Sequence, residues 1–238
     1  MVYDHSIHYT RHTLRQYLPM SGKAMLNRIL DILRMEVNFS GKSFADVGCS
    51  TAYITAVIVD EFKPDIAVGM DIHQPNLELA KQRYPHIQFQ TINLNEDNKP
   101  ETQYDVLICT ETLEHVGELT TAIDNLIKLK KSQGFLLILV PDEIGWLGFL
   151  RVLWRVIRYG YNALNCFQEI PKQKFLFLKY MWSLLTGERV SKYRNERSHW
   201  CTHFGFDYRD IDDYLQVKNV DFYAYNKFGN RYYIVRET

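Results

Sequence analysis

The residues Asp46-Val47-Gly48-Cys49-Ser50-Thr51-Ala52-Tyr53 decide the fold of this chain. They follow a short apolar run, residues 43–47, and lead into a helical pattern over residues 52–62 that Pro64 ends. A strand that ends in a glycine turn before a helix directs backbone N–H groups and the helix N-terminus toward a ligand. The stretch therefore predicts a ligand-binding turn at the carboxyl end of a buried strand.

Apolar strands and helices alternate on both sides of this turn. The expected strands are residues 43–47, 66–72, 87–94, 104–109 and 135–140, and the expected helices are residues 52–62, 75–84 and 119–130. Near-continuous apolar strands separated by helices predict a parallel sheet that is covered on both faces. Right-handed crossovers place ligands at the carboxyl ends of such strands.

The C-terminal residues follow a different pattern. A helix is expected over residues 207–215, followed by strands at 220–226 and 231–236 with Gly229 and Asn230 in the turn between them. Such a pair predicts an antiparallel hairpin. The fold class is therefore α/β, a Rossmann-like doubly wound seven-stranded sheet with a terminal antiparallel hairpin and a helical insertion after the fifth strand.

We expect a single domain built from four segments. They are an N-terminal helical cap at 1–42, a core at 43–141, a helical insertion at 142–200, and the terminal helix and hairpin at 201–238.

Composition excludes several classes of protein. The 238 residues carry 28 Lys and Arg against 28 Asp and Glu, which argues against nucleic-acid binding by whole-surface attraction. The four cysteines form no C-x-x-C pair, so zinc-ribbon and thioredoxin sites are not expected. The chain contains neither a G-x-G-x-x-G fingerprint nor a P-loop. Without a leader-like or membrane-spanning apolar run, a cytoplasmic location is expected.

Four motifs, in order, resemble the class I S-adenosylmethionine-dependent methyltransferases. Residues 46–53 resemble the family's first motif, and Asp71 stands where a second acidic residue ends the second strand. Residues 104–116 contain Leu113-Glu114-His115-Val116, which resembles the start of the segment after the fourth strand, and residues 133–141 resemble the fifth strand. The resemblance implies S-adenosyl-L-methionine as the cofactor.

The resemblance also implies roles for individual residues. Asp46 and Gly48 would line the amino-acid end of the cofactor, and Asp71 would accept hydrogen bonds from both ribose hydroxyls. The remaining implied cofactor-binding residues are Cys49 and Ser50 in the turn, Ile72 on the adenine, Asn93 with Leu94 at the adenine edge, and Thr110 beside the methionine moiety. The chain departs from the family pattern where Ser50 replaces a glycine and Ala52 replaces another, although both residues are small.

A cluster of acidic and histidine residues follows the expected fourth strand. Glu111, Glu114 and His115 would share one face if a helix began at or before Glu111. Two carboxylates and an imidazole could then bind Mg²⁺ or Mn²⁺. The spacing is similar to that of metal-dependent 2′-O-methyltransferases that act on small-RNA 3′ ends, whose further histidine would correspond to His199 or His203.

Two alternatives do not involve a metal. His115 could simply hydrogen-bond locally, with a glutamate facing solvent. Alternatively, His115, His199 or His203 could be a general base, because histidine titrates near neutral pH and an acceptor hydroxyl must lose a proton.

The insertion is basic and aromatic. Residues 143–200 hold ten Lys or Arg and four Glu, and ten minus four leaves +6, set against −6 for the rest of the chain. Its two apolar runs, 144–157 and 175–185, are too short to span a bilayer. They could be two helices packed over the core, or a peripheral membrane contact through residues 144–185.

These observations predict methyl transfer, chiefly to an oxygen of a small-molecule, glycan or lipid-linked acceptor. The alternatives are a metal-dependent RNA ribose 2′-O-methyltransferase and a non-catalytic interaction module with the same fold. The protein would be cytoplasmic or peripheral to the membrane.

Overall fold

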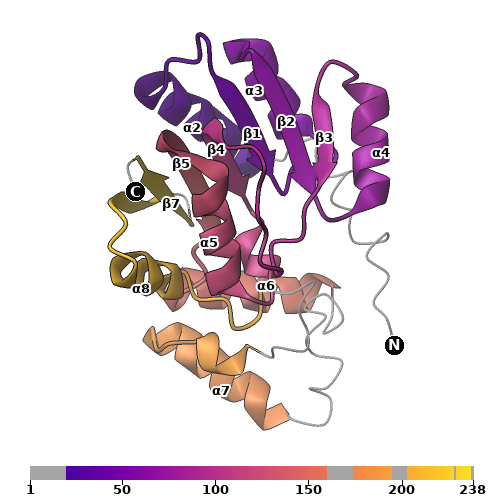
Figure 1. Ribbon diagram of the computed structural model, residues 1–238. Coiled ribbons are helices and arrows are strands. Elements are labelled where there is room, and N and C mark those ends of the chain that lie inside the picture. The colour runs from indigo at the N-terminus through magenta and orange to yellow at the C-terminus, as the bar shows by residue number, and fades with distance from the viewer. Residues whose placement is uncertain (1–19, 160–173, 195–202, 228, 237–238) are drawn as a thin grey trace.

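A seven-stranded sheet forms the centre of the computed structural model, which describes residues 20–159, 174–194, 203–227 and 229–236 (Figure 1). The strand order is β3-β2-β1-β4-β5-β7-β6. The strands are β1 Ser43–Val47, β2 Ile66–Asp71, β3 Gln88–Thr91, β4 Tyr104–Thr110, β5 Lys130–Pro141, β6 Phe222–Lys227 and β7 Asn230–Val235. β1 to β5 pair in parallel, whereas β7 pairs antiparallel with both β5 and β6. The predicted fold class is therefore confirmed.

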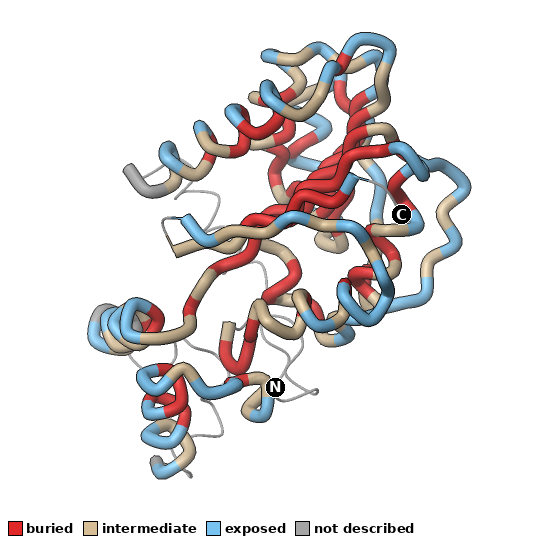
Figure 2. Tube along the Cα trace, turned by 90° about the vertical axis from the view of Figure 1, so that its left-hand side faces the viewer, coloured by how far each residue is buried: buried red, intermediate tan, exposed pale blue. Residues whose placement is uncertain are grey.

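Helices cover both faces of this sheet. The helices are α2 Met20–Glu36, α3 Tyr53–Phe62, α4 Gln74–Arg83, α5 Leu119–Leu129, α6 Gly145–Tyr159, α7 Lys174–Thr186 and α8 Arg209–Val217. Alternate residues of β5 enter opposite cores: Leu136 packs with residues of α5 and α8, and Leu137 packs with residues of α2 and α3. Figure 2 shows the resulting pattern, with buried strands and helices buried along one side. Burial on both faces explains why these strands are apolar throughout.

Two strands differ in length from the prediction by more than one residue. β5 begins at Lys130 and not near Phe135, because Lys130 pairs with Tyr104 across an irregular step in the register. The buried Lys130 ammonium donates hydrogen bonds to three backbone carbonyls, which replaces its hydration. β3 is shorter than predicted, because it is an edge strand and its pairing ends where Thr91 meets Asp71 at the end of β2.

The insertion after β5 contains the helices α6 and α7, which pack against each other through a small separate core. Arg151 of α6 fastens this pair to the sheet, because its Nη1 donates to Asp142 O at 3.1 Å and to Gly229 O at 2.7 Å. Gly229 has φ +73°, and a Cβ there would lie 1.6 Å from Arg151 Nη2. A glycine in the β6–β7 turn therefore allows α6 to dock.

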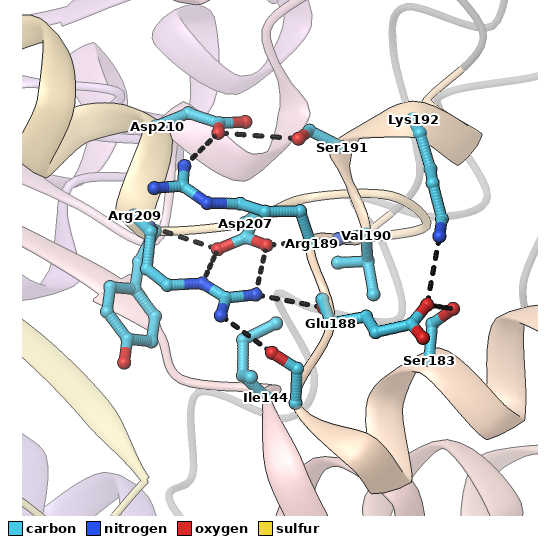
Figure 3. Close-up of polar contacts among 12 residues, drawn as sticks. Ile144, Ser183, Glu188, Arg189, Val190, Ser191, Lys192, Asp207, Arg209 and Asp210 are labelled. Carbon is cyan, nitrogen blue, oxygen red and sulfur yellow. Dashed lines mark hydrogen bonds and ion pairs between the residues drawn. The ribbon is translucent and has the colours of Figure 1, made fainter.

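A charged cluster joins the segment after α7 to the start of α8 (Figure 3). The buried Asp207 carboxylate accepts hydrogen bonds from Val190 N and from the Arg209 guanidinium. Arg209 in turn donates to the carbonyls of Gly187 and Glu188. This cluster sets the position of α7 relative to the core.

Candidate cofactor and acceptor site

The turn after β1 lies against the end of β2 and the loop after β4. Gly48 N and Cys49 N both donate to Met70 O, at 2.7 and 3.0 Å. Gly48 has φ +83°, and a Cβ there would lie 2.0 Å from Thr112 Oγ1. Only glycine fits this position, because the turn needs a left-handed backbone and leaves no room for a side chain.

The two residues that replace the family's glycines adopt a backbone conformation that is typical of glycine. Ser50 has φ +51° and Ala52 has φ +62°, both in the left-handed region. Such a conformation costs a residue with a side chain about 1–2 kcal/mol. The small side chains thus keep the shape of the turn, and the stored strain is typical of ligand-binding loops.

Asp71 links this turn to the segment after β2. Its Oδ2 accepts a hydrogen bond from Ser50 N and its Oδ1 accepts one from His73 N, each at 2.8 Å. Burial raises the pKa of Asp71, and these backbone hydrogen bonds oppose the rise. A carboxylate oxygen has two lone pairs, so each oxygen of Asp71 can accept a further hydrogen bond.

Asp46 is the second buried acid of this region. Thr55 Oγ1 donates to its Oδ2 at 2.6 Å, whereas Oδ1 has no hydrogen-bond partner among the described residues. Burial, with a smaller contribution from the Asp71 charge, raises the pKa of Asp46 to about 7. The raised pKa means that ionising Asp46 costs the folded protein free energy, and its Oδ1 accepts no hydrogen bond from the described residues. A buried acid of this kind is typical of a site for a polar or cationic ligand group.

The other predicted cofactor residues lie at neighbouring strand ends. Ile72 follows Asp71 and is half-buried, and Thr110 is the buried last residue of β4. Asn93 follows β3 in a turn, where it donates to Glu96 and its Oδ1 accepts from Asn95 N, and the neighbouring Leu94 is buried. Cys49 is a buried free cysteine, and burial raises the pKa of its thiol well above the usual value, which disfavours the thiolate.

The structure contradicts the helical arrangement predicted for the acidic and histidine residues after β4. Glu111 has φ +51°, and only a single 3₁₀ turn, Leu113–His115, precedes α5. Glu111 N donates to Leu139 O at 2.9 Å, so the chain is still held against β5 where a helix was expected. Glu111, Glu114 and His115 therefore do not share a helix face.

Instead, Glu114 and His115 meet a histidine from beyond the insertion. The rings of His115 and His203 lie edge to face with centroids 5.0 Å apart, and His115 Nε2 lies 3.9 Å from Glu114 Oε1. Glu114, His115 and His203 each offer a ligand atom, and these atoms all lie within 4.8 Å of one another. Glu111 is outside this group. His199, the other candidate, lies outside the described residues.

Sequence reasoning missed one member of this cluster, Glu143. It is buried just past the end of β5, and its Oε1 lies 3.4 Å from His203 Nδ1. The available signal was its position, because an acidic residue two places after a strand-ending proline belongs to the same carboxyl edge as Asp71.

The electrostatics of Glu114 are unusual. Its side chain is fully buried, and neither carboxylate oxygen has a hydrogen-bond partner in the described part of the chain. Burial and the nearby charge of Glu111 raise the pKa of Glu114 well above its usual value. Arg194, also largely buried, donates to the carbonyl of Glu114 and contributes a positive charge nearby. A buried unpartnered carboxylate beside two imidazoles fits a divalent cation, which favours such oxygen and nitrogen ligands.

A family model described as "Methyltransferase domain" matches residues 45–136. A malonyl-[acyl-carrier protein] O-methyltransferase of Acetivibrio thermocellus is 28% identical over 116 residues, which cover 48% of this chain and 40% of that protein. A ubiquinone biosynthesis O-methyltransferase of Coxiella burnetii is 26% identical over 112 residues, covering 44% of this chain and 46% of the relative. The chain thus spans less than half the length of these curated relatives.

Solved structures resemble the chain over most of its length. Magnesium protoporphyrin IX methyltransferase from Synechocystis, with bound SAH, superposes with a TM-score of 0.57 at 15% identity, covering 92% of this chain and 84% of that one. The methyltransferase domain of bacterial CtHen1-C gives a TM-score of 0.55 at 15% identity, covering 91% of this chain and 98% of that one. At these identities the likeness shows the fold alone.

The sheet order, the turn after β1 and the acid at the end of β2 define a Rossmann-like fold of the methyltransferase type. Together with the methyltransferase-domain model matched over residues 45–136, they support a class I S-adenosylmethionine-dependent methyltransferase.

Proposed function

We propose that the protein transfers a methyl group from S-adenosylmethionine to an oxygen of a small-molecule acceptor. The observation that carries this proposal is the polar cluster of Glu114, His115, Glu143 and His203, which follows β4 and β5. Those strands neighbour β1, whose turn is the proposed cofactor cradle. The names of the curated relatives, both O-methyltransferases, support transfer to oxygen.

The residues of the proposed cofactor site match the chemical groups of the cofactor one at a time. Asp71 offers acceptor capacity on two oxygens for the ribose hydroxyls, and Asp46 offers a carboxylate for the cationic end. The half-buried Ile72 supplies an apolar surface for the adenine. S-adenosylmethionine, once bound, supplies an electrophilic sulfonium-linked methyl group.

The residues of the cluster would act on the acceptor. An acceptor hydroxyl must lose its proton as the new C–O bond forms, and an imidazole within reach can take that proton. Glu143 would orient His203 through the 3.4 Å contact to Nδ1, which leaves Nε2 to face the acceptor. Alignment of the acceptor oxygen with the methyl group would supply most of the rate enhancement.

The first prediction concerns Asp71. Asp71→Asn is expected to weaken S-adenosylmethionine binding roughly tenfold, because a charge-assisted hydrogen bond becomes a neutral one and about 1.5 kcal/mol is lost. Titration calorimetry measures this effect directly, with Asp221→Asn, an exposed position before β6, as the matched control.

Wild-type protein that shows no heat of binding at millimolar ligand contradicts the proposal and favours the non-catalytic alternative. Binding without transfer of labelled methyl to any carboxylic acid, phenol or sugar hydroxyl contradicts the assignment of an oxygen acceptor only.

A second candidate function is methyl transfer assisted by a divalent cation. The observation that favours it is the group formed by Glu114, His115 and His203, together with the unpartnered buried carboxylate of Glu114. These three side chains would hold Mg²⁺ or Mn²⁺, which acts as a Lewis acid toward an acceptor oxygen. The described residues give no reason to prefer an RNA acceptor over a small molecule.

The second prediction tests this candidate without an acceptor. Wild-type protein is expected to bind Mn²⁺ in calorimetry or electron paramagnetic resonance, and Glu114→Gln should weaken that binding at least about tenfold, since one charged ligand is lost. Glu101→Gln, at an exposed loop position, is the matched control. Equal Mn²⁺ affinity in wild type and Glu114→Gln would exclude the metal and leave the histidines as bases.

A further inference from the structure

The helices α6 and α7 each have two apolar faces. One face of each helix packs into their shared core, which includes Val152 on α6 and Tyr180 and Leu184 on α7. The other face lies in solvent and carries most of the exposed large apolar side chains of the described chain. These exposed residues are Trp146, Leu147, Leu150, Trp154 and Ile157 on α6, and Phe175, Leu178, Trp182 and Leu185 on α7.

The exposed residues form one continuous stripe on each helix. Trp146, Leu150, Trp154 and Ile157 recur at intervals of four, four and three residues, which keeps them on one side of α6. The residues of α7 follow the same rule with intervals of three, four and three. Apolar stripes of this size on an otherwise polar surface mark an interaction site. We call the two stripes together the α6–α7 surface.

Tryptophan is prominent on this surface. Trp146, Trp154 and Trp182 are 60%, 57% and 62% exposed, although such a large apolar ring is normally well buried. Tryptophan is enriched where a protein meets the boundary between lipid headgroups and acyl chains, since its ring is apolar and its N–H is polar.

The charge of these helices has a single sign. α6 contains three arginines and α7 two lysines, and neither helix contains an aspartate or glutamate. On α7 an open groove of about 440 Å³ is lined by apolar and aromatic side chains, by Lys179 and Ser183, and by Glu188, whose carboxylate accepts from Lys192 Nζ. The apolar and aromatic residues are Phe175, Leu178, Trp182 and Tyr193. An ammonium group between apolar walls suits a ligand with an anionic head and hydrocarbon tails.

We propose that the α6–α7 surface seats the protein on the surface of an anionic lipid bilayer. Figure 1 shows α6 and α7 beyond the carboxyl ends of the strands, so this orientation turns the acceptor end of the molecule toward the membrane. None of the helices in the described ranges is long and apolar enough to cross a bilayer. The contact is therefore peripheral, and it stands whether or not the proposed reaction is correct.

A second copy of the chain fits this surface less well. In a two-fold dimer the same patch meets itself, so Lys179 of one α6–α7 surface would approach Lys179 of the other. Anionic lipid headgroups neutralise that charge instead.

The test is flotation of the purified protein with vesicles. We expect it to float with vesicles of phosphatidylcholine and phosphatidylglycerol mixed equally, and to bind vesicles of phosphatidylcholine alone more weakly. The variant that combines Trp146→Ser, Trp154→Ser and Trp182→Ser should stay with the lipid-free fraction. Lys179→Glu should reduce partitioning about thirtyfold, since it changes two units of charge at the lipid surface.

Two matched controls separate the α6–α7 surface from general effects. Tyr223→Ser removes a 64% exposed aromatic from β6, and Lys23→Glu makes the same charge change at an exposed position on α2. Both controls should float like wild type, and circular dichroism should show that every variant is folded.

The proposal is overturned if wild type fails to float with anionic vesicles, or if the triple tryptophan variant floats as well as wild type. It is also overturned if lipid-free wild type forms a dimer in sedimentation that the triple variant abolishes, because the surface would then serve a second copy of the chain.

Discussion

Replacing Asp46 with asparagine is expected to stabilise the cofactor-free protein at pH 8 while weakening cofactor binding. The pKa of Asp46 is raised from 3.8 to about 7, so ionisation of the folded protein costs about 4 kcal/mol at high pH. An asparagine has no charge to ionise and can still accept the hydrogen bond from Thr55. The buried amide group of the asparagine lacks a hydrogen-bond acceptor, which costs roughly 1 kcal/mol. The net stabilisation is therefore about 3 kcal/mol.

The pH dependence gives this prediction its sign. Because the folded pKa of Asp46 lies above the unfolded value, its contribution to wild-type stability is fully present below pH 3.8 and is lost as the pH rises toward about 7. The stability difference between Asp46→Asn and wild type should therefore grow across this window and level off above it. Urea unfolding at several pH values measures the difference.

The exposed Asp221→Asn serves as the control, and its stability difference should not change with pH over the same range. A difference for Asp46→Asn that is the same at pH 5 and pH 8 would show that Asp46 is ionised in the folded state with an ordinary pKa.

Because the ionised Asp46 lowers the stability of the cofactor-free protein, its role points to ligand binding and not to folding. The only described hydrogen-bond donor to Asp46 is Thr55, and Oδ1 is left with none in the described structure. A positively charged ligand group at that oxygen would lower the pKa and recover part of the lost stability. Asp46→Asn should therefore bind S-adenosylmethionine more weakly than wild type in calorimetry, although it is the more stable protein.

The position of the proposed cofactor site could be predicted from the sequence because its residues end or directly follow strands. In a parallel sheet, all carboxyl ends meet at one edge, so the position of a residue after its strand places it in space. Gly48, Asp71 and Thr110 lie where this rule predicts. The turn's left-handed Ser50 could not be predicted, because its conformation is imposed by hydrogen bonds to β2 and not by its own preference.

The acceptor end was less predictable because tertiary contacts determine it. A helical reading of Glu111 to His115 was reasonable from spacing alone, but β5 holds Glu111 N and delays the helix until Leu119. The contact of Glu143 with His203 joins residues on opposite sides of the insertion, and no local pattern encodes it.

The exposed faces of α6 and α7 were unpredictable for a different reason. α7 is apolar around most of its circumference, so hydrophobic periodicity does not indicate which face is buried. The arginines of α6 mark a polar stripe, but the rest of that helix is a wide apolar face of which only part is buried. Packing selects Val152 and Leu184 for the shared core and leaves Trp154 and Trp182 outside.

The last prediction concerns Asp207, a buried carboxylate whose pKa is lowered, whereas that of Asp46 is raised. Asp207→Asn is expected to destabilise the protein by about 3 kcal/mol, because it leaves the Arg209 guanidinium without its charged partner. Burial raises the pKa of Asp207, but hydrogen bonds from Arg209 and Val190 N outweigh that effect and the net shift is downward. The loss should therefore be complete above the unfolded pKa of Asp207 and should fade as the pH falls through its lower folded pKa.

Asp213 on the helix α8, which begins just after Asp207, provides a control in which the ion-pair distance is matched. Asp207 lies 2.7 Å from Arg209 Nη2 and Asp213 lies 2.7 Å from Arg189 Nη2, but their side chains are 0% and 60% exposed. Water already solvates Asp213, so Asp213→Asn should cost less than about 1 kcal/mol in the same urea titration. Equal losses would mean that the ion-pair distance, and not the burial of Asp207 within the cluster drawn in Figure 3, determines how firmly α7 is held. Unequal losses would identify Asp207 as the residue that fixes α7, and with it the α6–α7 surface, to the catalytic core.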